Sequence, residues 1–388
     1  MAAQGAKLRV YFDYNATAPL RSSVRQTMIE AMDLVGNASS VHSFGRDVRK
    51  KIESSRQRVA IALGLESKRV IFTSGATESN NLALKNFSGR VIVSAIEHDS
   101  VFKVRDDAVT IPVSTDGVVD LDNLDKLLEK NSGEPTLISV MAANNETGVI
   151  QPLAEIVQIA KKHRAYVHSD AVQAIGKVEF PWHMLDMISV SGHKLGGPAG
   201  IGCLVINTGL PIVPYIKGGG QERSYRAGTE NLIGIVGMAA AVEESLKDNW
   251  IHAKKLRDTL EDLISEIDPD ALVIKKETNR LSNTAVLYMA GVKSETQIMS
   301  FDLKGFAVSA GAACSSGKVK TSRVLEAMGF NTDKNGQVIR VSIGPNSNFK
   351  EIDGFVRAWQ SIYEKCSNAK SKYVNNVRGD DYEFAYGA

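Results

Sequence analysis

Lys194 stands in a glycine-rich turn, SGHKLGGPAGIG (191–202), directly after an apolar run that predicts a strand. Gly196, Gly197 and Gly200 allow a backbone to approach a ligand closely. A lysine in such a place can form a Schiff base with a carbonyl compound. An ordinary surface lysine in a turn is the alternative for this stretch taken alone.

Asp170 ends another apolar strand, in HSDAVQAIG (168–176), so its carboxylate is expected at the carboxyl edge of a sheet. Open α/β sheets bind ligands at that edge. A carboxylate there can pair with a protonated ring nitrogen. It can also simply cap the helix that follows.

The stretch TSGATESNN (73–81) joins a strand, a glycine turn and a helix start. Backbone N–H groups at that start, with the Thr77 hydroxyl, can bind a phosphate; a plain N-cap is the alternative.

Lys194 follows Asp170 by 24 residues (194 − 170). A Schiff-base lysine, a carboxylate and a phosphate site are what pyridoxal phosphate needs from a protein. The combination is more specific than any member.

Two further side chains could act on an amino-acid substrate. His98 follows a predicted strand in SAIEHDSV. Its ring could stack on a pyridine and move protons, or simply lie at the surface. Arg340 lies in the apolar strand VIRVSIG, where it needs an anion. A substrate carboxylate suits its bidentate fork, and a buried structural ion pair is the competing interpretation.

Cys314 is surrounded by small residues in SAGAACSSGKVK (309–320), where no large apolar side chain fixes the thiol in a core. No chemical role is predicted for the other two cysteines. Cys203, in GCLVI, is interpreted as a small core residue. Cys366 is interpreted as having no specific function. Wide spacing without a CxxC motif argues against disulfides and a metal site. It indicates a reduced, cytoplasmic protein.

Composition argues against a nucleic-acid-binding protein and against a membrane protein. The 388 residues carry 46 Lys and Arg against 44 Asp and Glu, a net charge of +2, which favours neither nucleic acid nor an acidic membrane surface. MAAQGAKLRV has no apolar signal region, and no run of about 18 apolar residues occurs. We therefore expect no membrane segment.

The elements that must position these residues alternate between strands and helices. Such alternation predicts βαβ units and a mainly parallel sheet. Residues 231–267 form a long helical stretch, and a smaller α+β unit follows a boundary near 255–270. We expect a large domain over 16–258 and a small domain formed by 1–15 and 259–388. The tail after about Lys370 shows no clear period and is expected to be mobile. The predicted strands are 69–74, 90–95, 136–143, 165–170, 187–192, 202–207, 283–289, 305–311 and 338–344.

Nine ordered motifs resemble the NifS/IscS-like cysteine desulfurases, class-V aminotransferase-type enzymes of PLP fold type I. They are YFDYNATAP, GNASSVHSFGR, FTSGATESNN, EHDSV, NNETGVIQP, HSDAVQ, SGHKLGGPAGIG, GGGQERSYRAGTEN and SAGAACSSGKVK. The resemblance covers roughly residues 10–365 and implies a seven-stranded sheet flanked by helices. The Arg-x-Gly-His-His-Cys pattern of the SufS-like branch is absent. SIGPNSNFKEID, with Pro345, departs from the arginine and Thr-Thr pair that many relatives carry after the glycine.

The resemblance also implies a role for each matching residue. Lys194 would bind pyridoxal phosphate covalently, Asp170 would pair with its ring nitrogen, and Gln173 would contact its phenolic oxygen. His98 would stack on the ring and assist proton transfer. Asn145 would line cofactor and substrate, Arg340 would hold the substrate carboxylate, and Cys314 would be the nucleophile. The phosphate would be held by Ala76, Thr77, Ser191 and His193, and by Thr229 from the neighbouring subunit of a homodimer.

The implied reaction removes sulfur from L-cysteine, giving L-alanine and a persulfide on Cys314. The persulfide would pass to an acceptor protein, an IscU-like scaffold or a SUF component, for iron–sulfur cluster assembly. A lyase or aminotransferase on the same fold, such as a selenocysteine lyase or a kynureninase-like enzyme, is one alternative. A catalytically weak scaffold subunit or regulator is another, although the set of Lys194, Asp170, His98 and Cys314 argues against it.

Overall fold

The computed structural model describes residues 9–130, 133–210, 212–311 and 321–380. Its main feature is a seven-stranded sheet in the order β2-β8-β7-β6-β5-β3-β4. Every neighbouring pair is parallel except the two pairs that involve β8. The expected mainly parallel α/β fold is therefore confirmed. The strands are β2 (Val70–Thr73), β3 (Arg90–Ser94), β4 (Val109–Ile111), β5 (Thr136–Ser139), β6 (Tyr166–Asp170), β7 (Met187–Ser191) and β8 (Gly202–Ile206).

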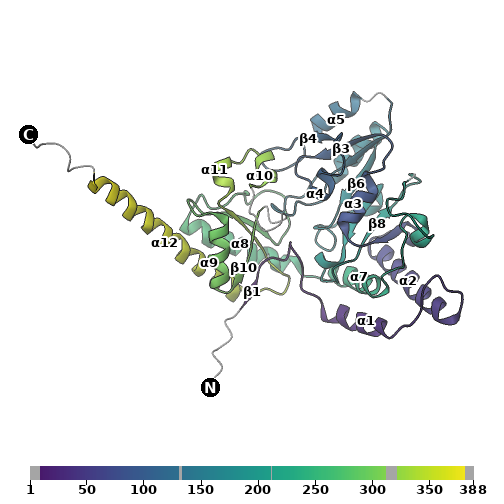
Figure 1. The fold of residues 1–388 in the computed structure, drawn as a ribbon. Helices are drawn as coiled ribbons and strands as arrows, with labels where there is room; N and C mark the ends of the chain where they lie inside the picture. The colour runs from purple at the N-terminus through teal and green to yellow at the C-terminus, as the bar shows by residue number, and fades with distance from the viewer. Residues whose placement is uncertain (1–8, 131–132, 211, 312–320, 381–388) are drawn as a thin grey trace, which may run out of the picture.

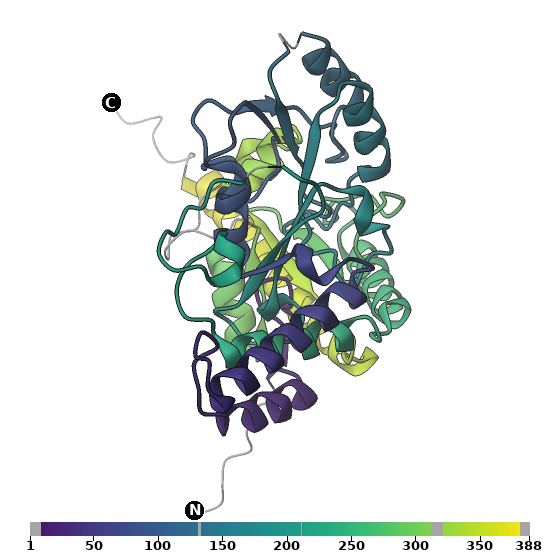
Figure 2. The ribbon, with the colours of Figure 1, turned by 90° about the vertical axis from the view of Figure 1, so that its right-hand side faces the viewer.

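Both faces of this sheet are buried, because successive side chains of a strand point to opposite sides. Phe72 joins the apolar cluster on one face, whereas Ile71 joins the cluster on the other. The α3 and α4 helices contribute to the second cluster, and α2, α5, α6 and α7 contribute to the first. Figures 1 and 2 show the helices packed around the sheet. The helices are α1 (Ser22–Met32), α2 (Ser43–Ala62), α3 (Ala76–Leu84), α4 (Asp99–Phe102), α5 (Leu121–Glu129), α6 (Leu153–Lys162) and α7 (Leu232–Ser245).

A second, smaller group of strands follows in the chain. The antiparallel sheet β11-β12-β9 lies beside a parallel pair in which β1 joins β10. Phe12, just after β1, is fully buried in the core of this group, so the N-terminal segment packs with residues near the C-terminus. The elements are β1 (Val10–Tyr11), α8 (Trp250–Ile267), β9 (Thr284–Tyr288), α9 (Ser294–Leu303), β10 (Phe306–Ala307), β11 (Ser309–Ala310), α10 (Arg323–Ala327), α11 (Thr332–Asn335), β12 (Val338–Ser342) and α12 (Phe349–Asp380).

The structure differs from the sequence predictions in several places. It adds β1 and β4, whose two and three residues are too few to show an alternating pattern. It divides the predicted strand 305–311 between β10 and β11. It breaks the long helical stretch before Asn249, whose side chain caps α8 by accepting from His252 N–H. Finally, α12 continues to Asp380, through the tail after about Lys370 in which the sequence shows no clear period. Figure 1 shows this helix leaving the body of the molecule.

None of the helices in the described ranges has the length and apolar character needed to cross a membrane. The exact division into domains at 15/16 and 258/259 stays a prediction.

We predict that Phe12→Ala destabilises the fold strongly. Phe12 packs edge-on against Phe355, with the two ring centroids 5.8 Å apart, and is 0% exposed. Replacing a buried phenylalanine with alanine costs about 3–5 kcal/mol. Chemical denaturation followed by tryptophan fluorescence measures this change. Ile251→Ala, at a position on α8 that is 73% exposed, is the control and should change stability by less than about 0.5 kcal/mol. A loss below about 1 kcal/mol for Phe12→Ala would contradict burial of the N-terminal segment.

Candidate active site

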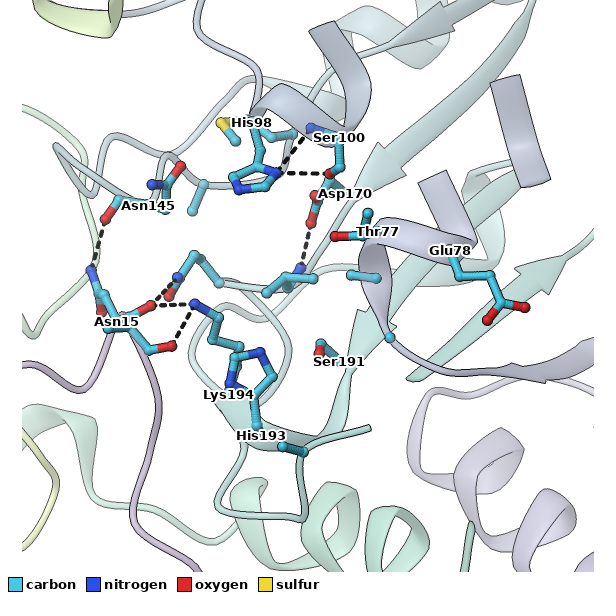
Figure 3. A pocket seen from close by; sticks show the side chains of 18 of the residues that line it. Asn15, Thr77, Glu78, His98, Ser100, Asn145, Asp170, Ser191, His193 and Lys194 are labelled. Atoms are coloured by element: carbon cyan, nitrogen blue, oxygen red, sulfur yellow. Dashed lines mark hydrogen bonds between the residues drawn. The ribbon is translucent and has the colours of Figure 1, made fainter. Parts of the chain in front are cut away.

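A cavity of ≈ 540 Å³ opens where strands β2, β6 and β7 end. Asp170 is the last residue of β6, and Ser191 is the last residue of β7. Since the carboxyl ends of parallel strands meet at one edge, these side chains reach the same space. Figure 3 shows them around the cavity with His98, Thr77 and Lys194. Ten predicted site residues line it: Ala76, Thr77, His98, Asn145, Asp170, Gln173, Ser191, His193, Lys194 and Arg340.

Two predicted residues do not appear in this lining. Thr229 is exposed on the surface of its own chain and is not part of the cavity wall. Cys314 lies outside the described residues. Cys203, by contrast, is fully buried in β8, where burial raises the pKa of its thiol to about 12. Its predicted role as a core residue is confirmed, and a thiol so rarely ionised is a poor nucleophile.

Lys194 is held by the N-terminal segment of the chain. Its Nζ donates hydrogen bonds to the backbone oxygens of Asn15, at 2.5 Å, and Ala16, at 2.9 Å. The Gln173 amide also donates to the Asn15 oxygen, at 2.9 Å. Asn15 therefore connects two predicted site residues, although no chemical role was predicted for it. Its position within the motif YFDYNATAP was the only signal available.

Asp170 and His98 are linked through two residues that the sequence analysis missed. The Asn80 side chain donates to Asp170 Oδ2, at 2.8 Å, and to Ser100 Oγ, at 2.9 Å. His98 Nδ1 accepts from the Ser100 backbone N–H, at 3.1 Å. This bond requires Nδ1 to be unprotonated, so a neutral ring carries its proton on Nε2. The other Asp170 oxygen accepts from Val172 N–H. The carboxylate is thus fixed with its oxygens among hydrogen-bond donors.

The start of α3 forms the opposite wall. Gly75 is its N-cap and supplies no side-chain cap, so the first N–H groups of the helix are available to an anion. A Cβ built on Gly75 would meet nothing within 4 Å, which leaves open space in front of the helix. On the β8 side, a Cβ on Gly202 would lie 2.7 Å from Gly75 Cα. Only glycine at 202 lets strand and turn approach this closely.

The charges of two side chains near this wall, Glu78 and His193, are set by their surroundings. Glu78 is paired with Arg226, whose Nε lies 2.9 Å from Glu78 Oε1. Burial, together with the nearby Lys194 ammonium, lowers the pKa of His193 to about 4. His193 is therefore neutral at ordinary pH. The Arg226 guanidinium therefore offsets part of the Glu78 charge at the start of α3, and His193 adds no charge there.

Arg340 lines the cavity and also forms a buried ion pair. Its Nη2 lies 2.6 Å from Asp13 Oδ1, and its Nη1 donates to the Asn145 backbone oxygen at 2.9 Å. Its side chain is 3% exposed, and its Nε has no partner among the described residues. The buried ion pair, one of the two interpretations left open by the sequence, is therefore present, and binding of a substrate carboxylate stays a prediction. Nη2 of the guanidinium is used in the ion pair with Asp13, whereas Nε can still donate a hydrogen bond to another acceptor.

Comparison with known proteins identifies the family. The family model described as Aminotransferase class-V matches residues 10–355. Cysteine desulfurase IscS of Dictyoglomus turgidum is 37% identical, over 92% of this chain and 95% of that relative. The chain belongs to the NifS/IscS-like family of class-V aminotransferases.

Solved structures agree with this family fold. A NifS-like protein from Rickettsia africae is 36% identical and superposes with a TM-score of 0.85, covering 92% of this chain and 99% of that one. A structure described as SspA in complex with cysteine is 29% identical, with a TM-score of 0.74, covering 87% and 100%. The expected fold type of the NifS/IscS-like family is thereby confirmed for this member. Across its described residues, no three His, Cys, Asp or Glu side chains gather as a metal site.

We predict that the buried Glu97, beside His98, makes the stability of this NifS/IscS-like chain fall as pH rises. Burial is the main cause that raises the pKa of Glu97, to about 8, and the Asp170 charge adds to it. Its Oε1 accepts from Ser94 Oγ and Met141 N–H, while Oε2 has no partner among the described residues. The stabilising contribution of this group is complete below about pH 4.5 and is lost as pH rises through about 8.

Glu97→Gln removes this titration. Between about pH 5 and pH 8.5 the Tm of the variant relative to the parent should therefore rise, by roughly 5 °C. Thermal unfolding across that range measures the difference. Glu155→Gln, at an exposed position on α6, should give a curve parallel to that of the parent. Equal pH slopes for Glu97→Gln and the parent would show that Glu97 titrates normally.

Proposed function

We propose that this protein is a pyridoxal-phosphate-dependent cysteine desulfurase. It would remove sulfur from L-cysteine, giving L-alanine and a persulfide on Cys314. The observation that carries this proposal is the meeting of Lys194, Asp170 and the start of α3 around one cavity. The names of the similar proteins, cysteine desulfurase and a complex with cysteine, support the substrate.

The residues of the cavity fit pyridoxal phosphate. Lys194 would hold it covalently, Asp170 would face its ring nitrogen, and Gln173 and His98 would contact the ring. Ala76, Thr77, Ser191 and His193 offer donors for its phosphate beside the open space at Gly75. When bound, this group withdraws electrons from the Cα atom of an amino acid.

Lys194 and His98, which hydrogen bonds hold in place, are the side chains that would transfer protons. Lys194 Nζ rests on two carbonyl oxygens, which can only accept, so its own N–H bonds point at them and its position is defined. His98 is oriented by Ser100. We assign to these two side chains the transfer of the proton that leaves the substrate Cα. Arg340 Nε and Asn145 would orient the substrate carboxylate.

The sulfur step balances without an added oxidant. The Cys314 thiolate attacks the substrate sulfur, so that an S–S bond forms and the substrate Cβ–S bond breaks. The released electron pair and a proton end on Cβ, which becomes the methyl group of alanine. The persulfide then passes to an acceptor protein, an IscU-like scaffold or a SUF component, for iron–sulfur cluster assembly. Because the thiolate must stay reduced between turnovers, we place the protein in the cytoplasm.

We also propose that the active unit is a homodimer. Large apolar side chains are exposed on α1, on the start of α2 and between them, and Val35 and Val41 are 75% and 85% exposed. Apolar surface of this kind typically marks an interface. Thr229 lies away from the cavity of its own chain, which suits a residue that contacts the phosphate of a partner. The exposed apolar residues of this region are Ile29, Met32, Leu34, Val35, Val41 and Phe44.

We predict that Cys314→Ser stops sulfur transfer but keeps substrate binding. A serine hydroxyl cannot accept the substrate sulfur, so alanine formation from L-cysteine should fall by roughly a hundredfold or more. The change in cofactor absorbance on adding L-cysteine should remain. Alanine and sulfide are measured in the presence of a thiol reductant. Cys366→Ser is the control and should match the parent. If Cys314→Ser formed alanine at the parental rate, another group would be the nucleophile.

We predict that Lys194→Ala abolishes the covalent attachment of pyridoxal phosphate. Borohydride reduction followed by mass spectrometry should add a pyridoxyl group to the parent chain and none to the variant. Lys177→Ala removes another amine close to the cavity and should keep the modification on Lys194. The same mass increase in Lys194→Ala would place the attachment elsewhere.

A further inference from the structure

Asp13 is an acidic side chain in contact with the site that the proposed reaction does not use. It follows β1 and forms an isolated bridge with Ser342, at the end of β12. Its carboxylate is 17% exposed and has two protein partners. Oδ1 lies 2.6 Å from Arg340 Nη2, and Oδ2 accepts from the Ser309 hydroxyl at 2.7 Å. Both oxygens are therefore used.

These partners occupy neighbouring strands. Ser309 on β11 is paired in register with Arg340 on β12. The carboxylate thus joins the guanidinium of one strand to the hydroxyl of the next. An arginine side chain that is otherwise free has several rotamers, and each contact that fixes one of them lowers the entropic cost of binding a ligand.

The main chain of Asp13 has a separate function. Its carbonyl oxygen accepts from the backbone N–H groups of Ala16 and Thr17, at 3.0 and 3.4 Å. These bonds close the turn whose Asn15 and Ala16 carbonyls hold Lys194. A substitution of the Asp13 side chain leaves these backbone bonds possible. The effect on Arg340 can therefore be separated from the effect on Lys194.

We propose that Asp13 is a positioning residue for Arg340, and that it orients the guanidinium so that its Nε edge receives the carboxylate of the amino-acid substrate. The inference rests on the proposed function for the identity of that substrate. Asp13 also neutralises part of the arginine charge, which weakens non-specific attraction of anions to the cavity. Affinity for a carboxylate then depends on geometry more than on net charge.

Asp13→Ala and Asp13→Asn separate orientation from charge. The alanine variant loses the acceptor, so its KM for L-cysteine should rise roughly tenfold, with kcat within about threefold of the parent. The asparagine variant keeps an oxygen for Arg340 Nη2, and the Ser309 hydroxyl can rotate to accept from its amide. Its KM should therefore stay within about threefold of the parent. Alanine formation at varied L-cysteine concentration measures both constants on the cofactor-loaded protein.

Glu261→Gln is the control for a merely structural role. Glu261 pairs with Arg280 at 2.6 Å, both side chains are buried, and neither lines the cavity. This variant should lower Tm and leave KM unchanged. The inference is overturned if Asp13→Ala leaves KM unchanged, if Glu261→Gln raises KM equally, or if Asp13→Asn is as impaired as Asp13→Ala.

A binding measurement keeps this test independent of the reaction. The absorbance of the cofactor-loaded protein is titrated with L-alanine, which carries the carboxylate but no sulfur. Asp13→Ala should weaken binding by roughly tenfold, and Asp13→Asn should bind as the parent does. If the parent forms no alanine from L-cysteine, the proposed function fails. The titration then still decides the role of Asp13, and equal affinities of Asp13→Ala and the parent overturn it.

Discussion

The site depends on the packing of one short segment, residues 10–17, between the two groups of strands. Phe12 anchors it in the core of the smaller group. The Asn15 and Ala16 carbonyls hold the Lys194 amine, and the Asn15 carbonyl also holds the Gln173 amide. These three hydrogen bonds all come from the N-terminal segment and not from the strands of the large sheet. The cavity of the candidate site is therefore formed by chain segments that lie 179 residues apart.

Such a junction buries many polar groups, and each must find a partner. Asn15 shows how this is solved. Its backbone N–H donates to Ser342 Oγ at 3.0 Å, its side-chain amide donates to Thr284 Oγ1 at 2.9 Å, and its side-chain oxygen accepts from Asn283 at 3.1 Å. A network with these partners satisfied holds a single arrangement, because any shift would leave several groups unpaired. This rigidity is what lets a backbone carbonyl act as a fixed support for Lys194.

Much of this site could be predicted from strand ends. Asp170 and Ser191 end apolar strands and Lys194 follows one, and parallel strands bring their carboxyl ends to one edge. Asn15 and Asn80 could not be found by this logic. Both are ordinary polar residues in sequence and gain importance from distant partners: Asp170 lies 90 residues from Asn80, and Gln173 lies 158 residues from Asn15. The end of α12 was missed for a local reason, because its last residues lack a regular apolar stripe.

The positive charge near the cavity is also limited by the burial of Lys177. Burial, followed by the nearby Lys194 and Arg340 cations, lowers the pKa of Lys177 to about 7. Lys177 Nζ donates to Gln173 Oε1 at 3.3 Å, so the same amine orients the amide that contacts the Asn15 carbonyl. A permanent cation at this place would repel a charged Lys194, whereas an amine that is readily deprotonated keeps the hydrogen bond without the full charge. The hydrogen bond from Lys177 thus orients Gln173. Burial lowers the pKa of Lys177, which reduces the positive charge close to Lys194.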